Sequence, residues 1–411
     1  MIESTGQTPA VKKDIRLTGG FMISSLAGGH AVFHWFMQSF VVLLPEVEAA
    51  FHLNAVGVGG ILTVREVVSG IVALPGGIVL DTIRRHWGLL LAACIGAVSV
   101  GSLLIGFSPA YPLLLAGMAI VAMAHSLWHL PAAASLSYKF AHRRGMALSF
   151  HGVGGSIGDV AGPLVTGALL AVLGWRGILS IYAVGPLFLA MLAIWSFRNI
   201  GGGSRTEDDL VALQDRIEMT KRLLQNPSLW GIILVRGFRA MALVALLTIL
   251  PLYLDVLGVR DFSLGFHIGL LIAIGIVAKP VMGHLSDRFG RKQVLVPGLL
   301  WSCLFAILLI PSGQGITLMV SIALLGLFLY PDQPIVTAAA LDIVGRDVAT
   351  TSLGFISFAS FLMAAVSPLI AGGLYETLGV KATMYYVAAL FAMAALTFAL
   401  VPLNRGDTAS A

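Results

Sequence analysis

Charged residues are scarce in this sequence. Asp, Glu, Lys and Arg together make up 11% of its 411 residues, whereas soluble domains carry about 25%. A soluble protein of this length would need more charge to cover the surface around its apolar core. The shortage excludes a cytosolic enzyme, a nucleic-acid-binding protein and a disordered scaffold.

Cysteine is also nearly absent. Cys94 and Cys303 are the only two, and both lie in apolar runs. Two such cysteines give neither a disulfide framework nor a metal-ligand spacing. Hydrophobic residues fill 58% of the chain, and the mean hydropathy is +0.93. These values indicate a polytopic, all-α membrane protein.

Twelve apolar runs are long enough to cross a membrane, because a spanning helix needs roughly 20 residues. The first run is too long for a cleavable signal, so we expect it to be retained. An even number of spans places both termini on the same side. The expected spans are 19–45, 55–80, 88–108, 111–138, 146–173, 178–197, 229–256, 264–286, 293–311, 315–341, 351–377 and 382–403.

The basic residues are distributed unevenly between the two sides of these spans. Of the 25 Lys and Arg residues, 18 fall in the tails and loops on one side, 3 on the other and 4 inside spans. Cytoplasmic loops carry the excess of Lys and Arg. We therefore expect both termini in the cytoplasm, with the chain in a bacterial inner membrane. The net charge of +5 reflects this topology and not a nucleic-acid partner.

The two halves of the sequence repeat each other. Gly77 and Asp81 match Gly283 and Asp287 at an offset of 206 residues, and several further pairs match at 205 or 206. The repeat predicts two pseudo-symmetric six-helix bundles, 1–197 and 229–411, joined by a cytoplasmic linker at 198–228. The linker reads either as an interfacial amphipathic helix or as a partly helical charged segment. Such repeats place a substrate site near the bilayer midplane.

The loop between spans eight and nine carries a recognisable motif. It reads Gly-His-Leu-Ser-Asp-Arg-Phe-Gly-Arg-Lys over 283–292 and resembles the cytoplasmic signature of the major facilitator superfamily. The first-half counterpart, 77–85, lacks the second glycine. The resemblance covers nearly the whole chain and implies the fold of that superfamily and an alternating-access transporter without a cofactor.

The motif residues are expected to form a cytoplasmic gate. Glycines allow helices to approach closely. Aspartates at helix ends can pair with basic side chains or with helix N-termini. The basic residues can anchor the loop to anionic lipid headgroups. Simple positive-inside anchoring would explain the arginines but not the repeated aspartate. The gate residues are Gly77, Asp81, Arg84, Arg85, Gly283, Asp287, Arg288, Gly290, Arg291 and Lys292.

Small residues recur every four positions in span five. Gly154, Gly158 and Gly162, followed by Pro163, predict a close-packing face. The stretch is similar to the fifth-helix motif of the superfamily's exporters and favours export, although such faces occur in any helical bundle. Segments 63–70, 129–132 and 143–155 together resemble the fosmidomycin-resistance-like branch, which implies export of small, often anionic compounds.

Ionisable residues inside the spans need a reason, because each costs about 2.5–3.5 kcal/mol at mid-bilayer on insertion scales. We expect them to line a substrate or proton cavity, with structural interhelical pairing as the alternative. Arg65 and Glu66 are adjacent, so we expect them not to face one partner, and Lys279 is expected to snorkel. The candidates are His30, His34, Arg65, Glu66, His125, His129, Asp159, Arg236, Arg239, Asp332 and Gln333.

The charges of these spans favour an anionic or zwitterionic substrate. The spans contain four basic residues and three acidic ones, which leaves one positive charge in excess. Arg236 or Arg239 would bind the anion. A desolvated carboxylate or a histidine would carry a coupling proton. The His-x3-His spacing in spans one and four also suits a metal ion, but no Cys or carboxylate accompanies it in those spans, and we assign no metal.

These observations predict a proton-coupled exporter of a small organic anion that works as a monomer among membrane lipids. An uptake symporter of the same fold is the first alternative. A membrane-embedded enzyme would need a nucleophile–base pair or a nucleotide-binding loop, and a sensor would need a soluble output domain; neither is found in the sequence.

Overall fold

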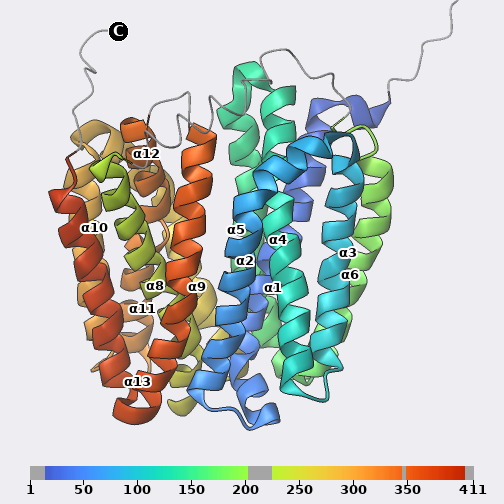
Figure 1. Cartoon of the computed structure of the whole chain (residues 1–411). Coiled ribbons are helices and arrows are strands. Elements are labelled where there is room, and N and C mark those ends of the chain that lie inside the picture. The colour runs from blue at the N-terminus through green and yellow to red at the C-terminus, as the bar shows by residue number, and fades with distance from the viewer. Residues whose placement is uncertain (1–13, 202–224, 345–348, 403–411) are drawn as a thin grey trace, which may run out of the picture.

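The computed structural model describes residues 14–201, 225–344 and 349–402. Within these ranges the chain forms helices and no strand (Figure 1). The long helices are α1 (Gly19–Phe51), α2 (Ala55–Thr82), α3 (Trp87–Gly106), α4 (Tyr111–Lys139), α5 (Arg144–Leu170), α6 (Trp175–Ser196), α8 (Pro227–Val256), α9 (Asp261–Phe289), α10 (Arg291–Leu308), α11 (Ile316–Leu329), α12 (Asp332–Val344) and α13 (Ala349–Leu400). Three short 3-10 helices, η1 (Ile15–Leu17), η2 (Arg84–His86) and η3 (Ala141–Arg143), flank them.

The described residues contain eleven helical segments that are long and apolar enough to cross a membrane. The last of these, Gly354–Leu400, has 47 residues; as one straight helix it would be roughly 70 Å long, more than twice the hydrocarbon thickness. Gly379 interrupts it with φ 78° and ψ −179°, a left-handed φ that suits glycine. The segment therefore crosses twice, and the twelve-helix fold predicted from the sequence is confirmed.

The tenth span differs from its prediction. The sequence predicted one continuous helix over 315–341, but α11 ends at Leu329 and α12 begins at Asp332. Pro331 lies between them. A proline inside a helix removes a backbone donor and clashes with the preceding turn, which explains the break. It places the Asp332 carboxylate at a helix N-terminus, where negative charge is favourable.

The helices form two bundles, α1–α6 and α8–α13 (Figure 1). Corresponding helices pack in the same way in each: α1 lies against α5, and α8 lies against the first part of α13, where Ser367 Oγ donates to the carbonyl of Met241. The start of α1 and the end of α13 lie at one end of the molecule, here called the termini end. The predicted linker helix falls mostly on 202–224, outside the described residues.

The bundles meet at the end opposite the termini. A Cβ on Gly265 of α9 would lie 2.3 Å from the carbonyl oxygen of Pro163 in α5, and one on Gly59 of α2 would lie 2.5 Å from the carbonyl oxygen of Pro368 in α13. Thr63 Oγ1 also donates to the carbonyl of Ala365 at 2.7 Å. Only glycine allows backbones this close, so α5–α9 and α2–α13 form the interface.

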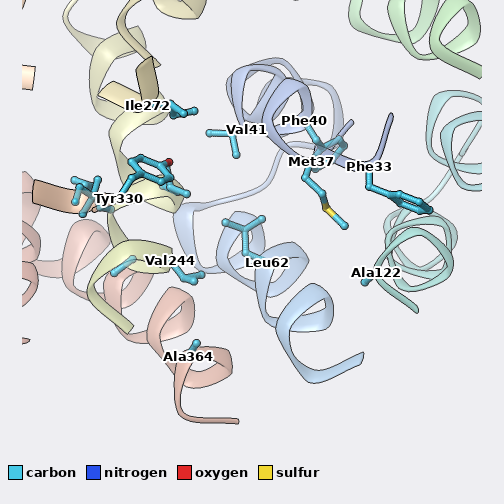
Figure 2. Packing of buried hydrophobic residues seen from close by; sticks show 14 of the residues in the cluster. Phe33, Met37, Phe40, Val41, Leu62, Ala122, Val244, Ile272, Tyr330 and Ala364 are labelled. Carbon is cyan, nitrogen blue, oxygen red and sulfur yellow. The ribbon is translucent and has the colours of Figure 1, made fainter. Parts of the chain in front are cut away.

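Toward the termini end, α5 and α9 carry exposed apolar side chains. Val153 and Ile157 of α5 and Val277 and Val281 of α9 are each more than half exposed. An apolar plug closes the opposite side: Val41 and Leu62 of the first bundle lie near Val244 and Ile272 of the second (Figure 2), and none of the four is more than 5% exposed. The structure is thus closed at the opposite end.

Candidate functional site

Five histidines gather in the middle of the first bundle. His30 and His34 lie on α1 and His125 and His129 on α4, as predicted, and the structure adds His151 of α5. The ring centroids of His30 and His34 are 4.5 Å apart, and the His151 ring stacks on His30 at 4.2 Å. The two predicted histidine pairs therefore form one cluster.

Backbone carbonyls fix the tautomers of two of these rings. Nδ1 of His30 donates to the carbonyl of His151 at 3.0 Å, and Nδ1 of His129 donates to the carbonyl of His125 at 2.7 Å. Carbonyl oxygens only accept hydrogen bonds. In their neutral forms both rings therefore present a bare Nε2, and these two atoms face each other at 3.1 Å.

His34 has a carboxylate partner. Its Nδ1 lies 2.8 Å from Oδ1 of Asp159 on α5, and the two side chains are 26% and 10% exposed. One ring nitrogen from each of His30, His34 and His129 lies within 4.8 Å of the other two. The structure thus places the predicted Asp159 beside the predicted histidines.

His151 is not among the site residues predicted from the sequence. It lies eight residues before Asp159 on α5, with Gly155 between them, so the three share one helix face. A Cβ on Gly155 would lie 2.8 Å from Cε1 of His30, so the glycine makes room for that imidazole. The regular spacing of His151, Gly155 and Asp159 was the signal that could have identified this residue.

Arg65 and Glu66 of α2 were not expected to face one common partner, and in the structure they pair with each other. Arg65 Nη2 lies 2.8 Å from Oε1 of Glu66, and its Nε donates to the same oxygen at 2.9 Å. The Cα–Cβ bonds of these two consecutive helix residues do point about 100° apart around the helix axis. Both side chains are long enough to fold toward one another, and within the protein the ion pair avoids two separate desolvated charges.

A second polar cluster lies in the other bundle, at the break between α11 and α12. Nε of Arg239 donates to Oδ2 of Asp332 at 2.7 Å, and its Nη2 donates to the carbonyl of Leu329 at 2.9 Å. These side chains are 7% and 2% exposed. Gln333, the next residue, is exposed. The unwound turn thus gives Arg239 both a carboxylate and a carbonyl.

Arg236 lies one turn from Arg239 and has different partners. Its Nη1 is 3.3 Å from Oγ1 of Thr337 and its Nη2 is 3.4 Å from Oγ of Ser357. Both are long, neutral contacts. Within the described part of the chain it has no carboxylate partner, so its charge is not neutralised as that of Arg239 is.

Lys279 of α9 does not snorkel as expected. Its Nζ lies 5.9 Å from the ring centroid of Tyr330, at the break after α11. A cation over an aromatic face is attracted by the ring quadrupole. Lys279 therefore joins the cluster of Arg236, Arg239 and Asp332, and Tyr330 is a further residue that the sequence analysis missed.

The predicted gate residues of the second half contact one another within that half. Arg291 bonds Asp287, and its Nε also donates to Oδ2 of Asp342, near the end of α12, at 3.2 Å. Gly290 has φ 105° and ends α9. Gly283, expected to pack closely, has nothing within 4 Å of a built Cβ. The close helix approach predicted at Gly283 is therefore not formed in this structure.

The remaining gate residues lie on the same end. Arg288 lies over Phe289, and Lys292 Nζ donates to the carbonyl of Ala399 at 2.8 Å. Arg84 lies over the ring of Tyr138 at 4.3 Å, and Arg85 contacts His86. The surroundings of Gly77 and Asp81 are outside the part of the chain whose side chains the structure describes.

The glycine face of α5 packs as predicted. Built Cβ atoms on Gly154, Gly158 and Gly162 would lie 2.0, 2.4 and 2.7 Å from the carbonyl oxygens of α1 residues 27, 31 and 35. Both helices advance by about one turn between these contacts. The face fixes α1 against α5 and so positions His30 and His34 beside His151 and Asp159.

Known proteins resemble this chain over nearly its whole length. The sequence profile of the Major Facilitator Superfamily matches residues 26–279 and 272–410. An uncharacterized MFS-type transporter of Bacillus subtilis (strain 168), YfnC, is 25% identical over 366 residues, covering 87% of each chain. A probable L-galactonate transporter of Escherichia coli (strain K12) is 26% identical and covers 57% of this chain and 56% of its own length.

Solved structures share the fold. A D-xylose-proton symporter superposes with a TM-score of 0.75 at 15% identity, covering 95% of this chain and 99% of its own. A bacterial homolog of the human lysosomal transporter Spinster, in an inward-facing and occupied conformation, gives 0.77 at 16% identity, covering 93% and 96%. The chain belongs to the Major Facilitator Superfamily and is a membrane transporter, not an enzyme.

Proposed function

We propose that this transporter exports a small organic anion in exchange for protons, by alternating access. The observation that carries the proposal is Arg236, a cation in the first half of α8 whose partners among the described residues are two hydroxyl groups at long distance. The neighbouring Arg239 is already neutralised by Asp332. A planar guanidinium with unused donors suits bidentate binding of a carboxylate or phosphonate.

Two further observations support an anionic substrate. Lys279 lies beside Tyr330, at the break that carries Asp332, and adds positive charge to this cluster. The probable L-galactonate transporter among the relatives is named for an aldonate, which is a carboxylate. The fosmidomycin-resistance-like branch suggested by the sequence would move compounds of the same charge class.

We place the coupling proton on Asp332. Its carboxyl group is buried and bonds Arg239, and its further electrostatic neighbours are Arg236 of α8, Lys279 of α9 and Tyr330 at the end of α11. A proton on Asp332 would release Arg239, and an arriving anion could then bind the freed cation. At this site proton and anion would therefore bind together, which favours the uptake symporter considered below. Exchange requires instead that Asp332 take up its proton only after the anion has left.

The excess of basic residues supports a cytoplasmic position for the termini end, and we propose that the structure, which is closed at the opposite end, corresponds to an inward-facing state. Export is favoured by the glycine face of α5. Uptake with protons is the second candidate, because the fold is shared with a D-xylose-proton symporter. The protein is proposed to act as a monomer in a bacterial inner membrane.

Flux in proteoliposomes tests the substrate class. Purified protein is screened with radiolabelled organic anions, neutral sugars and cations, with an imposed pH gradient of either sign. We expect anions alone to be transported, and Arg236→Ala to weaken their affinity by about 10- to 100-fold, as for a lost charged hydrogen bond. Arg236→Lys should recover part of it. Arg260→Ala, an exposed arginine at the opposite end, is the matched control.

The sign of the pH gradient that drives flux tests direction, and a double variant tests the proton carrier. Arg239→Gln with Asp332→Asn keeps a hydrogen-bonded pair without ionisable groups. It should retain anion counterflow but lose acceleration by the gradient. Arg260→Gln with Asp255→Asn neutralises an exposed pair and should change neither. Flux of neutral sugars that is indifferent to Arg236 would contradict the proposal.

A further inference from the structure

The histidine cluster of the first bundle is not used by the proposed anion and proton sites. It lies between α1, α4 and α5, whereas Arg236, Arg239 and Asp332 belong to the second bundle. His30 is 8% exposed and His34 is 26% exposed at its side chain, so the cluster is enclosed but not sealed. The arrangement of its ring nitrogens and their hydrogen bonds suits a bound cation.

The strongest indication is the contact between His30 and His129. Each ring has committed its Nδ1 proton to a carbonyl, so two lone pairs meet at 3.1 Å between the Nε2 atoms. Two acceptors at this distance repel unless a cation lies between them. In a tetrahedral zinc site with bonds of 2.0–2.1 Å, neighbouring nitrogens are about 3.3 Å apart. The observed separation matches that geometry.

His34 supplies a third nitrogen. One ring nitrogen of each of His30, His34 and His129 lies within 4.8 Å of the others, so a modest movement of His34 would complete a three-histidine set. Its Nδ1 is held by the Asp159 carboxylate, which leaves Nε2 for a metal. Metal-ligating histidines usually bond their other nitrogen to a carbonyl or carboxylate, and all three do so here.

From this geometry we infer that His30, His34 and His129 bind a divalent transition-metal ion such as Zn²⁺, with Asp159 orienting His34. Three imidazoles leave a fourth coordination position open. Imidazole ligands select Zn²⁺, Co²⁺, Ni²⁺ or Cu²⁺ over Mg²⁺ and Ca²⁺. The ion would join α1 to α4 inside the first bundle. The inference does not depend on the identity of the transported anion.

Binding of the metal alone tests it. Full-length protein, purified through a tag without histidines and placed in lipid nanodiscs, is titrated calorimetrically with Zn²⁺ and with Co²⁺, whose visible absorption reports tetrahedral nitrogen coordination. We expect one ion per chain. His129→Gln and His30→Ala should abolish binding, and Asp159→Asn should weaken it by about 10- to 100-fold.

His267 provides a matched control. It is a buried membrane histidine on α9 whose Nδ1 also donates to the carbonyl four residues earlier, Ser263, at 2.7 Å. His267→Ala should leave Zn²⁺ affinity unchanged. Size-exclusion profiles identify variants that fail to fold, and the Co²⁺ spectrum of the unmodified protein is informative without any variant.

Three outcomes would overturn the inference. They are absence of Zn²⁺ binding to the unmodified protein, a Co²⁺ spectrum without nitrogen ligation, and binding that survives His129→Gln. In the first case ¹⁵N spectra of the imidazoles would instead reveal one proton shared by His30 and His129. Anion flux is measured separately, so failure of the metal site and failure of the proposed transport are distinguishable.

Discussion

Nε of Arg239 lies 2.7 Å from Oδ2 of Asp332, and this ion pair joins α8 to the first residue of α12. Both side chains are buried. The pair therefore stabilises the unwound turn at Tyr330 and Pro331 while holding a buried carboxyl group inside the tenth span. The structural role of the pair and the transport role proposed for it can be separated by substitution.

Asp332→Leu alone should destabilise the protein by about 3–5 kcal/mol, because it leaves a buried guanidinium unpaired. Arg239→Met with Asp332→Leu should recover most of that stability, since apolar replacements of a buried pair are often neutral. Neither variant should show flux that a pH gradient accelerates, because both lack the carboxyl group proposed to carry the proton. Thermal unfolding in detergent, followed by flux in proteoliposomes, measures both effects. A single variant as stable as the unmodified protein would show that the pair has no structural role.

Gly158→Ala should loosen the contact between α1 and α5. Its Cβ would lie 2.4 Å from the carbonyl oxygen of Ala31, and overpacking of this kind costs about 1–3 kcal/mol. Gly152→Ala is the control on the same helix, because a Cβ there meets nothing within 4 Å. Unfolding temperatures in detergent compare the two. Equal temperatures would mean that α1 can move away from α5 without cost.

Gly155→Ala should disturb the histidine cluster rather than the stability of the fold. The new methyl group would lie 2.8 Å from Cε1 and 3.0 Å from Nδ1 of His30, and would push the ring from its bond to the His151 carbonyl. We expect Zn²⁺ affinity to fall by about 10- to 100-fold, as it does when a hydrogen bond that orients a metal ligand is lost. Calorimetry checks this, with Gly152→Ala again as the reference. Unchanged affinity would place the metal away from His30.

Glu376→Ala should weaken closure at the end opposite the termini. Oε1 of Glu376 accepts from the backbone nitrogen of Ala55 at 2.7 Å, so a carboxylate of α13 caps α2 across the two bundles. Such a contact is typically worth 0.3–1 kcal/mol, or roughly a two- to fivefold shift between conformations. Glu46→Ala, an exposed acid at the same end, is the control.

A cysteine at Val41 in the apolar plug reports that shift. In Glu376→Ala the thiol should react faster with a membrane-impermeant reagent added from the opposite side. The native Cys303 is half-buried and is first replaced by alanine, while Cys94 is buried. Labelling rates that match those of Glu46→Ala would show that Glu376 does not hold the bundles closed.

Much of the fold could be predicted from local patterns. Apolar length located twelve crossings, and the four-residue spacing of Gly154, Gly158 and Gly162 indicated the face that packs on α1. Each of these features is contained in the sequence of a single helix. The break at Pro331 was missed because the apolar run continues through it, and hydropathy does not register a lost backbone donor.

The site depended more on tertiary structure. Spacing indicated that His30 and His34 share a face, as do His125 and His129, but not that the two faces meet or that His151 joins them. Helix directions predicted that Arg65 and Glu66 would diverge, yet their flexible side chains pair. Those outcomes depend on which helices are neighbours and on how desolvated charges find partners.

By itself the sequence determined that the chain is a twelve-helix membrane protein with a repeated half, because the bilayer requires continuous apolar helices wherever the chain crosses it. Only the tertiary structure decided the use of the rare polar groups. It neutralised Arg239 but not Arg236, and it set the bare nitrogens of His30 and His129 against each other. The physical reason is that burial makes each polar group depend on its partners, and here those partners come from other helices.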